Sequence, residues 1–271
     1  MNKKYARKLI LSCSVTESHI KEFLLLKFSV ELFRNCCWYL SCDKYSFDLL
    51  NKEDNCFCEN LNLENGKVFG NEKEVSNFYG VIKGKFEATK RAINDYGECL
   101  LVDSDIIFCG ELQDFAVGID AAVCPHYQWH PEMDKAWGLY NVGFVYIKNI
   151  EFLQAWEQET FSGNYEFEQK PIQSVVEYDC FKVQRLPIQH NMGWWRFNSA
   201  EKRVRANSFD CWNDSIWFDG NLVSSFHFHS FVECNHSQPL KDFVFKRLLP
   251  NTSSGKQIIE EYNRLKLWSG H

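Results

Sequence analysis

Apolar runs suited to β-strands alternate along this chain with amphipathic stretches of helical spacing, and this alternation constrains the fold most. The run KLILSCSVT at 8–16 precedes SHIKEFLLLKFSVELF at 18–33, and the apolar run CCWYLSC follows at 36–42. A helix predicted over 83–97 then leads directly into the run ECLLVDSD. A chain that alternates strand and helix in this way predicts an α/β fold, with a mainly parallel central sheet flanked by helices.

The rest of the chain continues the same pattern. The further predicted strands are 121–126, 138–149 and 222–231, and the further predicted helices are 150–160, 169–178 and 255–268. The Asn-rich segment 51–77 is punctuated by glycine and is predicted to be a loop. No repeat or linker divides the chain, so we expect a single domain over 1–237 with a C-terminal helical tail, 238–271, packed on it.

Charge and cysteine content exclude several classes of protein. The 30 basic and 36 acidic residues are dispersed and give a net charge of -6, so no basic stripe is present to neutralise nucleic-acid phosphates. The twelve cysteines include no CxxC pair, which predicts buried free thiols in a reducing compartment. No apolar run reaches the length of a membrane span or signal peptide. We therefore expect a cytoplasmic protein that does not bind nucleic acid.

Two aspartates follow the apolar run of the segment LLVDSDIIF. Asp103 and Asp105 are separated by Ser104, and alternate residues of an extended chain point to the same face. A divalent cation relieves the repulsion between two such carboxylates, and Mg²⁺ and Mn²⁺ prefer oxygen ligands. An Asp-x-Asp pair also commonly caps a helix or lines a solvated loop, and the spacing alone does not separate these interpretations.

A pair of histidines, His227 and His229, lies in the segment FHFHSF. The two side chains share one face of the predicted strand, and imidazole completes mixed oxygen and nitrogen sites for Mn²⁺. Two histidines among phenylalanines suit core or interface positions equally well. Together with the aspartate pair they favour a metal site.

Six segments in order, LLVDSDIIF, AAVCPH, GLYNVGFVYIKN, FEQKPIQ, LPIQHNMGWWRFN and FHFHSF, resemble nucleotide-sugar glycosyltransferases of the GT-A fold. They are similar in particular to a poorly characterised bacterial and viral set with D-x-D, N-x-G, D/E-Q and H-F-H motifs. The resemblance covers about residues 8–231. It implies a Rossmann-like GT-A domain and metal-dependent transfer of a sugar from a nucleotide-diphosphate sugar, with a UDP-sugar favoured. The acceptor would be a hydroxyl of a glycan, a lipid-linked sugar or a protein, and retention of configuration is favoured.

The resemblance also implies roles for individual residues. Asp103 and Asp105 would bind Mn²⁺ or Mg²⁺ that bridges the two phosphates of the donor. His227 would be the third ligand, because His-x-x-Ser here resembles the His-x-x-Gly of related retaining transferases, and His229 is the competing choice. The donor would otherwise be contacted by a dispersed set of residues: Ser14, Val15 and Thr16 at the base and ribose, Ser104 at the ribose, and Lys83, Lys85, Lys90 or Arg91 at the phosphates.

The sugar and acceptor side of the site would be lined by further segments. Asn141 would hydrogen-bond sugar hydroxyls and Gly143 would permit close approach of the backbone. Glu168 and Gln169 would lie near the reacting carbon if configuration is retained, whereas inversion requires a carboxylate as general base. The family pattern has Asp where this chain has Glu168. The acceptor side would also include His126 and the segment HNMGWWRFN, whose tryptophans equally suit a core.

Two other functions fit parts of the same pattern. A haloacid-dehalogenase-type phosphatase also follows an apolar run with D-x-D, but there the motif normally ends the first strand and has Thr or Val where this chain has Ile107. A non-catalytic protein that binds nucleotides or sugars on the same fold is the second alternative. The intact set Asp103, Asp105 and His227 favours the enzyme.

Overall fold

The computed structural model describes residues 8–61, 72–126, 132, 134–135, 138–163, 168–197 and 206–269. Its centre is a seven-stranded sheet with the order β3-β2-β1-β4-β7-β6-β8. The strands are β1 (Leu9–Val15), β2 (Cys36–Cys42), β3 (Cys56–Asn60), β4 (Cys99–Val102), β6 (Ala121–Pro125), β7 (Tyr140–Ile147) and β8 (Val183–Arg185). β1, β2, β3 and β4 are parallel, β6 and β8 are parallel to each other, and β7 is antiparallel to both β4 and β6. The predicted α/β fold with a mainly parallel sheet is confirmed.

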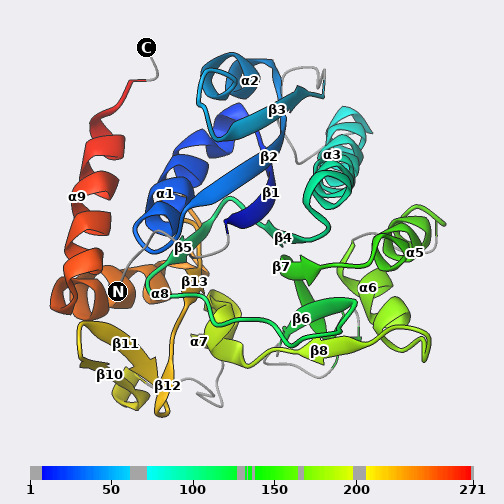
Figure 1. Cartoon of the computed structure of the whole chain (residues 1–271). Helices are drawn as coiled ribbons and strands as arrows, with labels where there is room; N and C mark the ends of the chain where they lie inside the picture. Colours follow the sequence, from blue (N-terminus) through cyan, green and yellow to red (C-terminus); the bar gives the residue numbers. More distant parts are fainter. Residues whose placement is uncertain are drawn as a thin grey trace.

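Helices cover both faces of this sheet (Figure 1). α1 (Ile20–Glu31) and α2 (Lys44–Leu50) pack on one face, and α3 (Glu72–Tyr96), α5 (Ile150–Thr160) and α6 (Gln169–Val176) pack on the other. On the first face the ring of Phe23 meets Trp38 edge-on at 5.1 Å, and on the second Phe86 meets Trp156 at 4.9 Å. The two faces of the sheet thus carry two separate apolar cores. Burial of each such ring stabilises the fold by about 1.5–3 kcal/mol.

Two small sheets lie beside the central sheet, and one of them holds part of the candidate site. The first joins β5 (Ile106–Phe108), β13 (Ser225–His227) and β9 (Met192–Gly193), and the second is an antiparallel meander of β10 (Phe209–Trp212), β11 (Ser215–Phe218) and β12 (Asn221–Leu222). β13 is antiparallel to β5 and parallel to β9. The first small sheet therefore brings residues after 190 beside the segment that follows Asp103.

The remaining elements are short, apart from the last helix. They are η2 (Glu17–His19), η3 (Ile188–His190), α7 (Trp194–Phe197), η4 (Ala206–Ser208), α8 (Gln238–Phe243), the π-helical turn η5 (Val244–Leu248), η6 (Leu249–Asn251) and α9 (Ser253–Leu267). α9 packs against α1, and both contribute to the core formed with the small sheets. The division into a domain over 1–237 and a tail over 238–271 stays a prediction. None of the described helices is long and apolar enough to span a bilayer.

The elements differ from the sequence-based prediction in two places. The whole of segment 51–77 was expected to be a loop, but β3 and the first residues of α3 lie inside it, and 62–71 fall outside the described residues. The expected strand over 222–231 is also interrupted, because its described strands end at Leu222 and His227 and the chain bends at Phe228. Eight of the twelve cysteines are buried free thiols, as predicted, whereas Cys180 and Cys211 are exposed.

Candidate metal site

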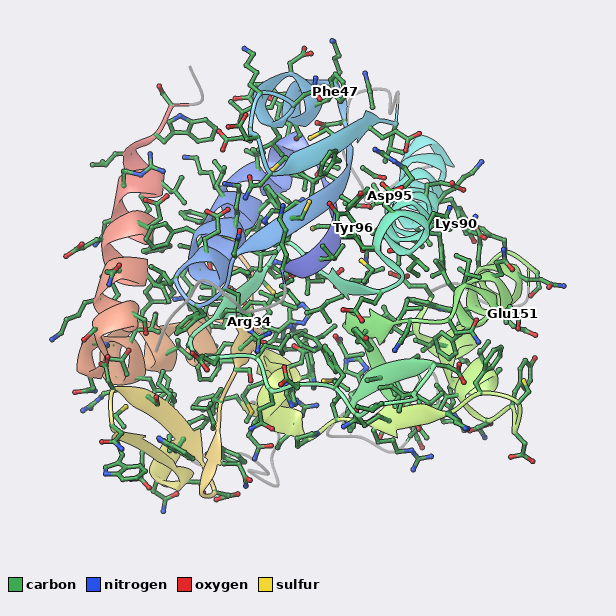
Figure 2. The ribbon with its side chains drawn as sticks, in the orientation of Figure 1. Arg34, Phe47, Lys90, Asp95, Tyr96 and Glu151 are labelled. Atoms are coloured by element: carbon green, nitrogen blue, oxygen red, sulfur yellow. The ribbon has the colours of Figure 1, made fainter. Side chains whose placement is uncertain are left out.

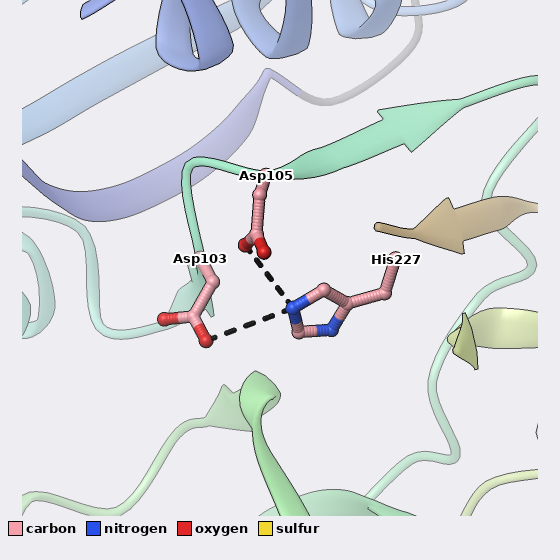
Figure 3. Close-up of side chains that lie close together, drawn as sticks. All are labelled: Asp103, Asp105 and His227. Carbon is pink, nitrogen blue, oxygen red and sulfur yellow. Dashed lines mark ion pairs between the residues drawn. The ribbon is translucent and has the colours of Figure 1, made fainter. Parts of the chain in front are cut away.

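Asp103 and Asp105 lie where the chain passes from the central sheet into the first small sheet. β4 ends at Val102, and the backbone amide of Asp103 donates to the carbonyl of Gly143 at 2.9 Å, which continues the pairing with β7. The chain then turns, and β5 begins at Ile106. The sequence suggested that both aspartates belong to one extended strand, but a turn separates β4 from β5 at this point. Their carboxylates nevertheless converge on one side chain (Figure 3).

That side chain is His227, at the end of β13. Its Nε2 lies 3.1 Å from Asp105 Oδ1 and 4.0 Å from Asp103 Oδ2, and one ligand atom from each residue lies within 4.8 Å of the others. Asp105 is 8% exposed and His227 is 5% exposed. Two carboxylate oxygens and one imidazole nitrogen at this spacing form a donor set that suits Mn²⁺, and Mg²⁺ less closely because of the nitrogen. The residues therefore fit the cation that the sequence predicts.

A chain of buried amides sets the orientation of the His227 ring. Its Nδ1 lies 3.2 Å from Asn191 Oδ1, and the Asn191 amide nitrogen donates to Asn141 Oδ1 at 2.8 Å. Asn141 Oδ1 also accepts the backbone N–H of Gly143 at 3.0 Å. Because Asn191 presents an acceptor to Nδ1, that nitrogen carries the hydrogen of the neutral ring, and Nε2 is the nitrogen that faces the carboxylates and can take up a proton or bind a cation. The Asn141 side-chain oxygen thus makes its hydrogen bonds inside the protein, to Asn191 and Gly143.

The charges at this cluster are strongly linked. Burial raises the pKa of Asp105, but His227, His229 and His19 outweigh this effect and hold the pKa of Asp105 below its usual range. Burial lowers the pKa of His227, but Asp105 and Asp103 outweigh burial and raise it. A proton on His227 thus stabilises the carboxylates when no cation does so. Cation binding would displace that proton, which makes cation affinity dependent on pH.

Gly143 permits the close approach of Asp103 and His227. A Cβ atom built at position 143 would lie 2.6 Å from His227 Cε1 and 2.9 Å from Asp103 Cγ, and closer still to Asp103 Oδ2. These separations are well below van der Waals contact. A side chain at 143 would therefore push Asp103 and His227 apart. The sequence predicted that Gly143 lets the backbone approach another group closely, and in the structure the groups that it approaches are these two side chains.

Lys85 of α3 brings a positive charge to the opposite side of Asp103. Its Nζ lies 2.7 Å from Asp103 Oδ1 and 3.1 Å from Glu168 Oε1. Burial lowers the pKa of Lys85, but the two carboxylates outweigh this effect and raise it above the usual range. Glu168, directly before α6, is held by a hydrogen bond from Trp156 Nε1 to its carbonyl at 2.9 Å. The candidate site thus extends from His227 through Asp103 to the start of α6.

The other basic candidates on α3 lie elsewhere. Lys83 is exposed, and Lys90, labelled in Figure 2, pairs with Glu87 and Glu157. Arg91 pairs with Glu59. Of the four basic residues predicted on this helix, Lys85 is the one that the structure brings to the aspartates.

Comparison with known proteins identifies the architecture. No protein-family model and no curated protein sequence matches the chain. Among solved structures, galactosyltransferase LgtC with donor and acceptor sugar analogs superposes with a TM-score of 0.58 at 11% identity, over 96% of this chain and 97% of that one. Apo glycosyltransferase GlyE of Streptococcus pneumoniae TIGR4 gives 0.51 at 13% identity, over 97% of this chain and 64% of GlyE. The chain has the GT-A fold. Mouse xyloside xylosyltransferase 1 also matches, with a TM-score of 0.51 at 11% identity over 85% of this chain and 99% of that one.

On this GT-A fold, Gln169 lies at the start of α6 beside Glu168. Its Oε1 is buried and accepts no hydrogen bond within the described structure. Such an unpaired buried acceptor costs about 1–3 kcal/mol of folding free energy. Glu168 and Gln169 are thus adjacent but different: the carboxylate is engaged by Lys85, and the amide oxygen is unpaired.

The residues predicted to contact a nucleotide base and ribose lie at the carboxyl end of β1, where the hydroxyls already have partners. Ser14 Oγ donates to the Val81 carbonyl at 3.1 Å, and Thr16 Oγ1 lies 3.2 Å from His19 Nδ1. Val15 is fully buried, and its carbonyl accepts the backbone N–H of Asp43. These residues therefore shape the edge of the site chiefly through backbone and packing. Ser104 lies half-buried in the turn between the aspartates.

His229 lies at the other oxygen of Asp105, and His19 lies beside His229. His229 Nδ1 is 3.2 Å from Asp105 Oδ2, and the rings of His19 and His229 are 6.5 Å apart. His19 was not among the site residues predicted from the sequence. A signal was present, because His19 follows the end of β1 and the carboxyl ends of parallel strands gather at one edge of the sheet.

Trp195 packs against His227, the candidate histidine ligand. Its ring meets His227 edge-on at 5.0 Å and His126 edge-on at 4.8 Å, and Trp195 is 2% exposed. Arg196, also buried, donates to the Asn191 carbonyl at 2.6 Å. The Trp-rich segment thus supports the site from behind, and contact with an acceptor stays a prediction.

Proposed function

We propose that this protein is a metal-dependent glycosyltransferase that moves a sugar from a UDP-sugar to a hydroxyl acceptor. The observation that carries the proposal is the convergence of Asp103, Asp105 and His227 at the carboxyl edge of a GT-A sheet. The matched galactosyltransferase LgtC was solved with donor and acceptor sugar analogs, which makes sugar transfer the first activity to test.

In this proposal the three residues hold Mn²⁺ or Mg²⁺, with His229 as the alternative imidazole ligand. The bound cation would offset the negative charge that grows on the departing nucleoside diphosphate. Lys85 pairs with both Asp103 and Glu168 and offsets one of their two negative charges, and its ammonium would also attract a phosphate oxygen. Ser14, Val15, Thr16 and Ser104 would line the nucleoside, and Lys83 is less suited to this role because it is exposed.

Retention of configuration is favoured within this proposal. Inversion requires a carboxylate that accepts a proton from the acceptor hydroxyl, and Glu168 already pairs with Lys85 at 3.1 Å. The unpaired amide oxygen of Gln169 would instead face the sugar or the reacting carbon. Gly143 and Asn141 support the floor of the site. The acceptor is proposed to be a glycan, a lipid-linked sugar or a protein, and the narrower kinship with a bacterial and viral set belongs to the same proposal.

The phosphatase alternative gains no support, because the aspartate pair follows β4 rather than the first strand and meets a histidine from β13. A non-catalytic binding protein remains the alternative to be tested. The decisive experiment measures UDP release from a panel of UDP-sugars with Mn²⁺, first with water and then with sugar acceptors. Asp105→Asn should lower turnover at least roughly 100-fold, since loss of several kcal/mol of charge stabilisation slows the reaction tenfold for about every 1.4 kcal/mol.

Asp114→Asn is the matched control, because Asp114 is an exposed surface carboxylate that pairs with Arg34 at 3.3 Å. Its turnover should equal that of the wild type. Binding of UDP-sugars without metal and without turnover would refute the transferase and favour the non-catalytic alternative. The anomeric configuration of the first product, followed by NMR, decides between retention and inversion.

A further inference from the structure

Glu22 is a buried acid in the first turn of α1 whose carboxylate binds the backbone that follows the histidines. It is 2% exposed. Its Oε2 accepts the N–H of Ser230 at 2.9 Å, and its Oε1 accepts the N–H groups of Phe231 at 2.8 Å and Val232 at 3.2 Å. One side chain thus fixes three consecutive peptide groups that lie some 208 residues away in the sequence.

Such a carboxylate is costly at this position. Burial raises the pKa of Glu22, and nearby Asp105 raises it further, whereas the three backbone donors oppose both effects. Its neighbours on α1, Phe23, Leu25 and Leu26, are fully buried hydrocarbons. An apolar residue at 22 would pack there without desolvating a charge, but it would leave three buried N–H groups unpaired. The buried carboxylate at position 22 is therefore explained by its hydrogen bonds to the backbone of residues 230–232.

The held segment begins at the histidines. The Phe228 N–H donates to the carbonyl of Asp105 at 3.1 Å, and Lys241 of α8 donates to the carbonyl of Ser230. His227 and His229 flank Phe228, and they reach the two different oxygens of Asp105. The segment is thus tied at its start to the aspartate turn and at its end to Glu22.

α1 also holds the aspartate side of the cluster. Ser29 Oγ, two turns after Glu22, accepts the N–H of Phe108 in β5 at 3.0 Å, and Asp105 directly precedes that strand. The same helix therefore fixes the chain after Asp105 and the chain after His229. Its position sets the separation between carboxylate and imidazole ligands.

We infer that Glu22 is a positioning residue that holds His227 and His229 against Asp105 and so sets the cation affinity of the site without being a ligand. The inference rests on the metal site of the proposed function, but not on the transfer reaction. Residues that orient metal ligands typically change metal affinity 10- to 100-fold when substituted.

The test compares Glu22→Gln with Glu31→Gln in the full-length protein. The glutamine side chain of Glu22→Gln would keep the shape of the native one but replace one acceptor oxygen with a donor nitrogen that opposes a backbone N–H. Glu31 is the matched control, because it lies on the same helix and pairs with Lys27 at 3.0 Å. Two measurements are made: the dissociation constant for Mn²⁺, from the EPR signal of free Mn²⁺, and the hydrogen exchange of peptides that cover 225–233.

Glu22→Gln should weaken Mn²⁺ binding at least tenfold and accelerate exchange over 225–233, with exchange over α5 unchanged. Glu31→Gln should leave both quantities within twofold of the wild type. If Glu22→Gln fails to fold, as judged by near-UV circular dichroism, Glu22→Asp supplies the comparison. Aspartate keeps the charge but has a shorter reach, so Glu22→Asp should weaken Mn²⁺ binding by more than about twofold relative to the wild type and accelerate exchange over 225–233.

Mn²⁺ affinity within twofold of the wild type in a folded variant would overturn the inference, as would unchanged exchange over 225–233. A wild-type protein that binds no Mn²⁺ would overturn it too. A wild-type protein that binds Mn²⁺, and loses that affinity in Glu22→Gln, but transfers no sugar would refute the proposed function and leave the role of Glu22 standing.

Discussion

Replacement of Gly143 with alanine adds one methyl group to the narrowest part of the candidate site. The added carbon would lie 2.6 Å from His227 Cε1 and 2.9 Å from Asp103 Cγ, whereas ordinary contacts begin near 3.4 Å. Gly143 lies within β7 and is not among the described residues with positive φ, so alanine meets no backbone penalty. The effect of Gly143→Ala should therefore arise from displacement of the two ligands.

The size of the effect follows from these distances. His227 must retreat by roughly 0.8 Å, and Asp103 by roughly as much, to restore contact distances, whereas metal sites tolerate only about 0.2 Å in ligand positions. Lys85 and the Gly143 carbonyl also restrain Asp103. We expect Mn²⁺ affinity to fall at least roughly 100-fold, and unfolding free energy to fall by about 1–3 kcal/mol through overpacking.

Val142→Ala separates the two effects. Val142 precedes Gly143 on β7, is 2% exposed and packs into the apolar core on the side of α3 and α5. Its truncation should cost about 1–3 kcal/mol of unfolding free energy while Mn²⁺ affinity stays within about threefold. Calorimetric titration with Mn²⁺ and urea denaturation measure the two quantities. Gly143→Ala with wild-type Mn²⁺ affinity would show that Asp103 and His227 do not bind the cation together.

Two other perturbations test buried titratable side chains, Lys85 at the cluster and His190 in the turn before β9. Lys85→Met leaves Asp103 and Glu168 without the ammonium between them, and should lower the unfolding free energy by about 3–5 kcal/mol. The rate of sugar transfer should fall by a larger factor than the Mn²⁺ affinity. Transfer at the wild-type rate would contradict the role given to Lys85. Burial lowers the pKa of His190 to about 4, so its contribution to stability is complete above the unfolded pKa near 6.5 and is lost as the pH falls toward 4. From pH 7.5 to pH 5, urea denaturation should show that the wild type loses about 2 kcal/mol more unfolding free energy than His190→Gln, and equal losses would refute this account.

The aspartates and His227 could be chosen from the sequence because each lies in a short motif, D-x-D or H-F-H, next to an apolar run. Lys85 could also have been chosen over Lys83. On α3, Lys85 lies three residues before Ala88 and seven before Ala92, which are both fully buried, whereas Lys83 lies on the exposed face. Helical periodicity therefore contained the answer that a simple list of basic residues did not.

Other parts of the site depend on long-range contacts that no local pattern encodes. Asn191 matters because β9 pairs with β13, and His19 because β1 ends near the aspartate turn. Glu22 gave only an indirect signal, as a charge within the apolar face of a helix. β3 was missed for a different reason: a five-residue strand with alternating burial and Asn at its end has the composition of a loop.

The cluster around Asp105 collects its members from nearly the whole length of the chain. Helix α1 and the segment after β13 meet through a contact that spans 208 residues. Closing so long a loop has a high entropy cost, so we expect this contact to form late in folding. During synthesis, the aspartates emerge long before His227. The nascent sheet thus exposes two adjacent carboxylates before His227 and His229 have been synthesised. In the proposed function, acquisition of the cation is accordingly a late event in folding, and a chain interrupted before β13 keeps the aspartate motif but lacks the proposed histidine ligand.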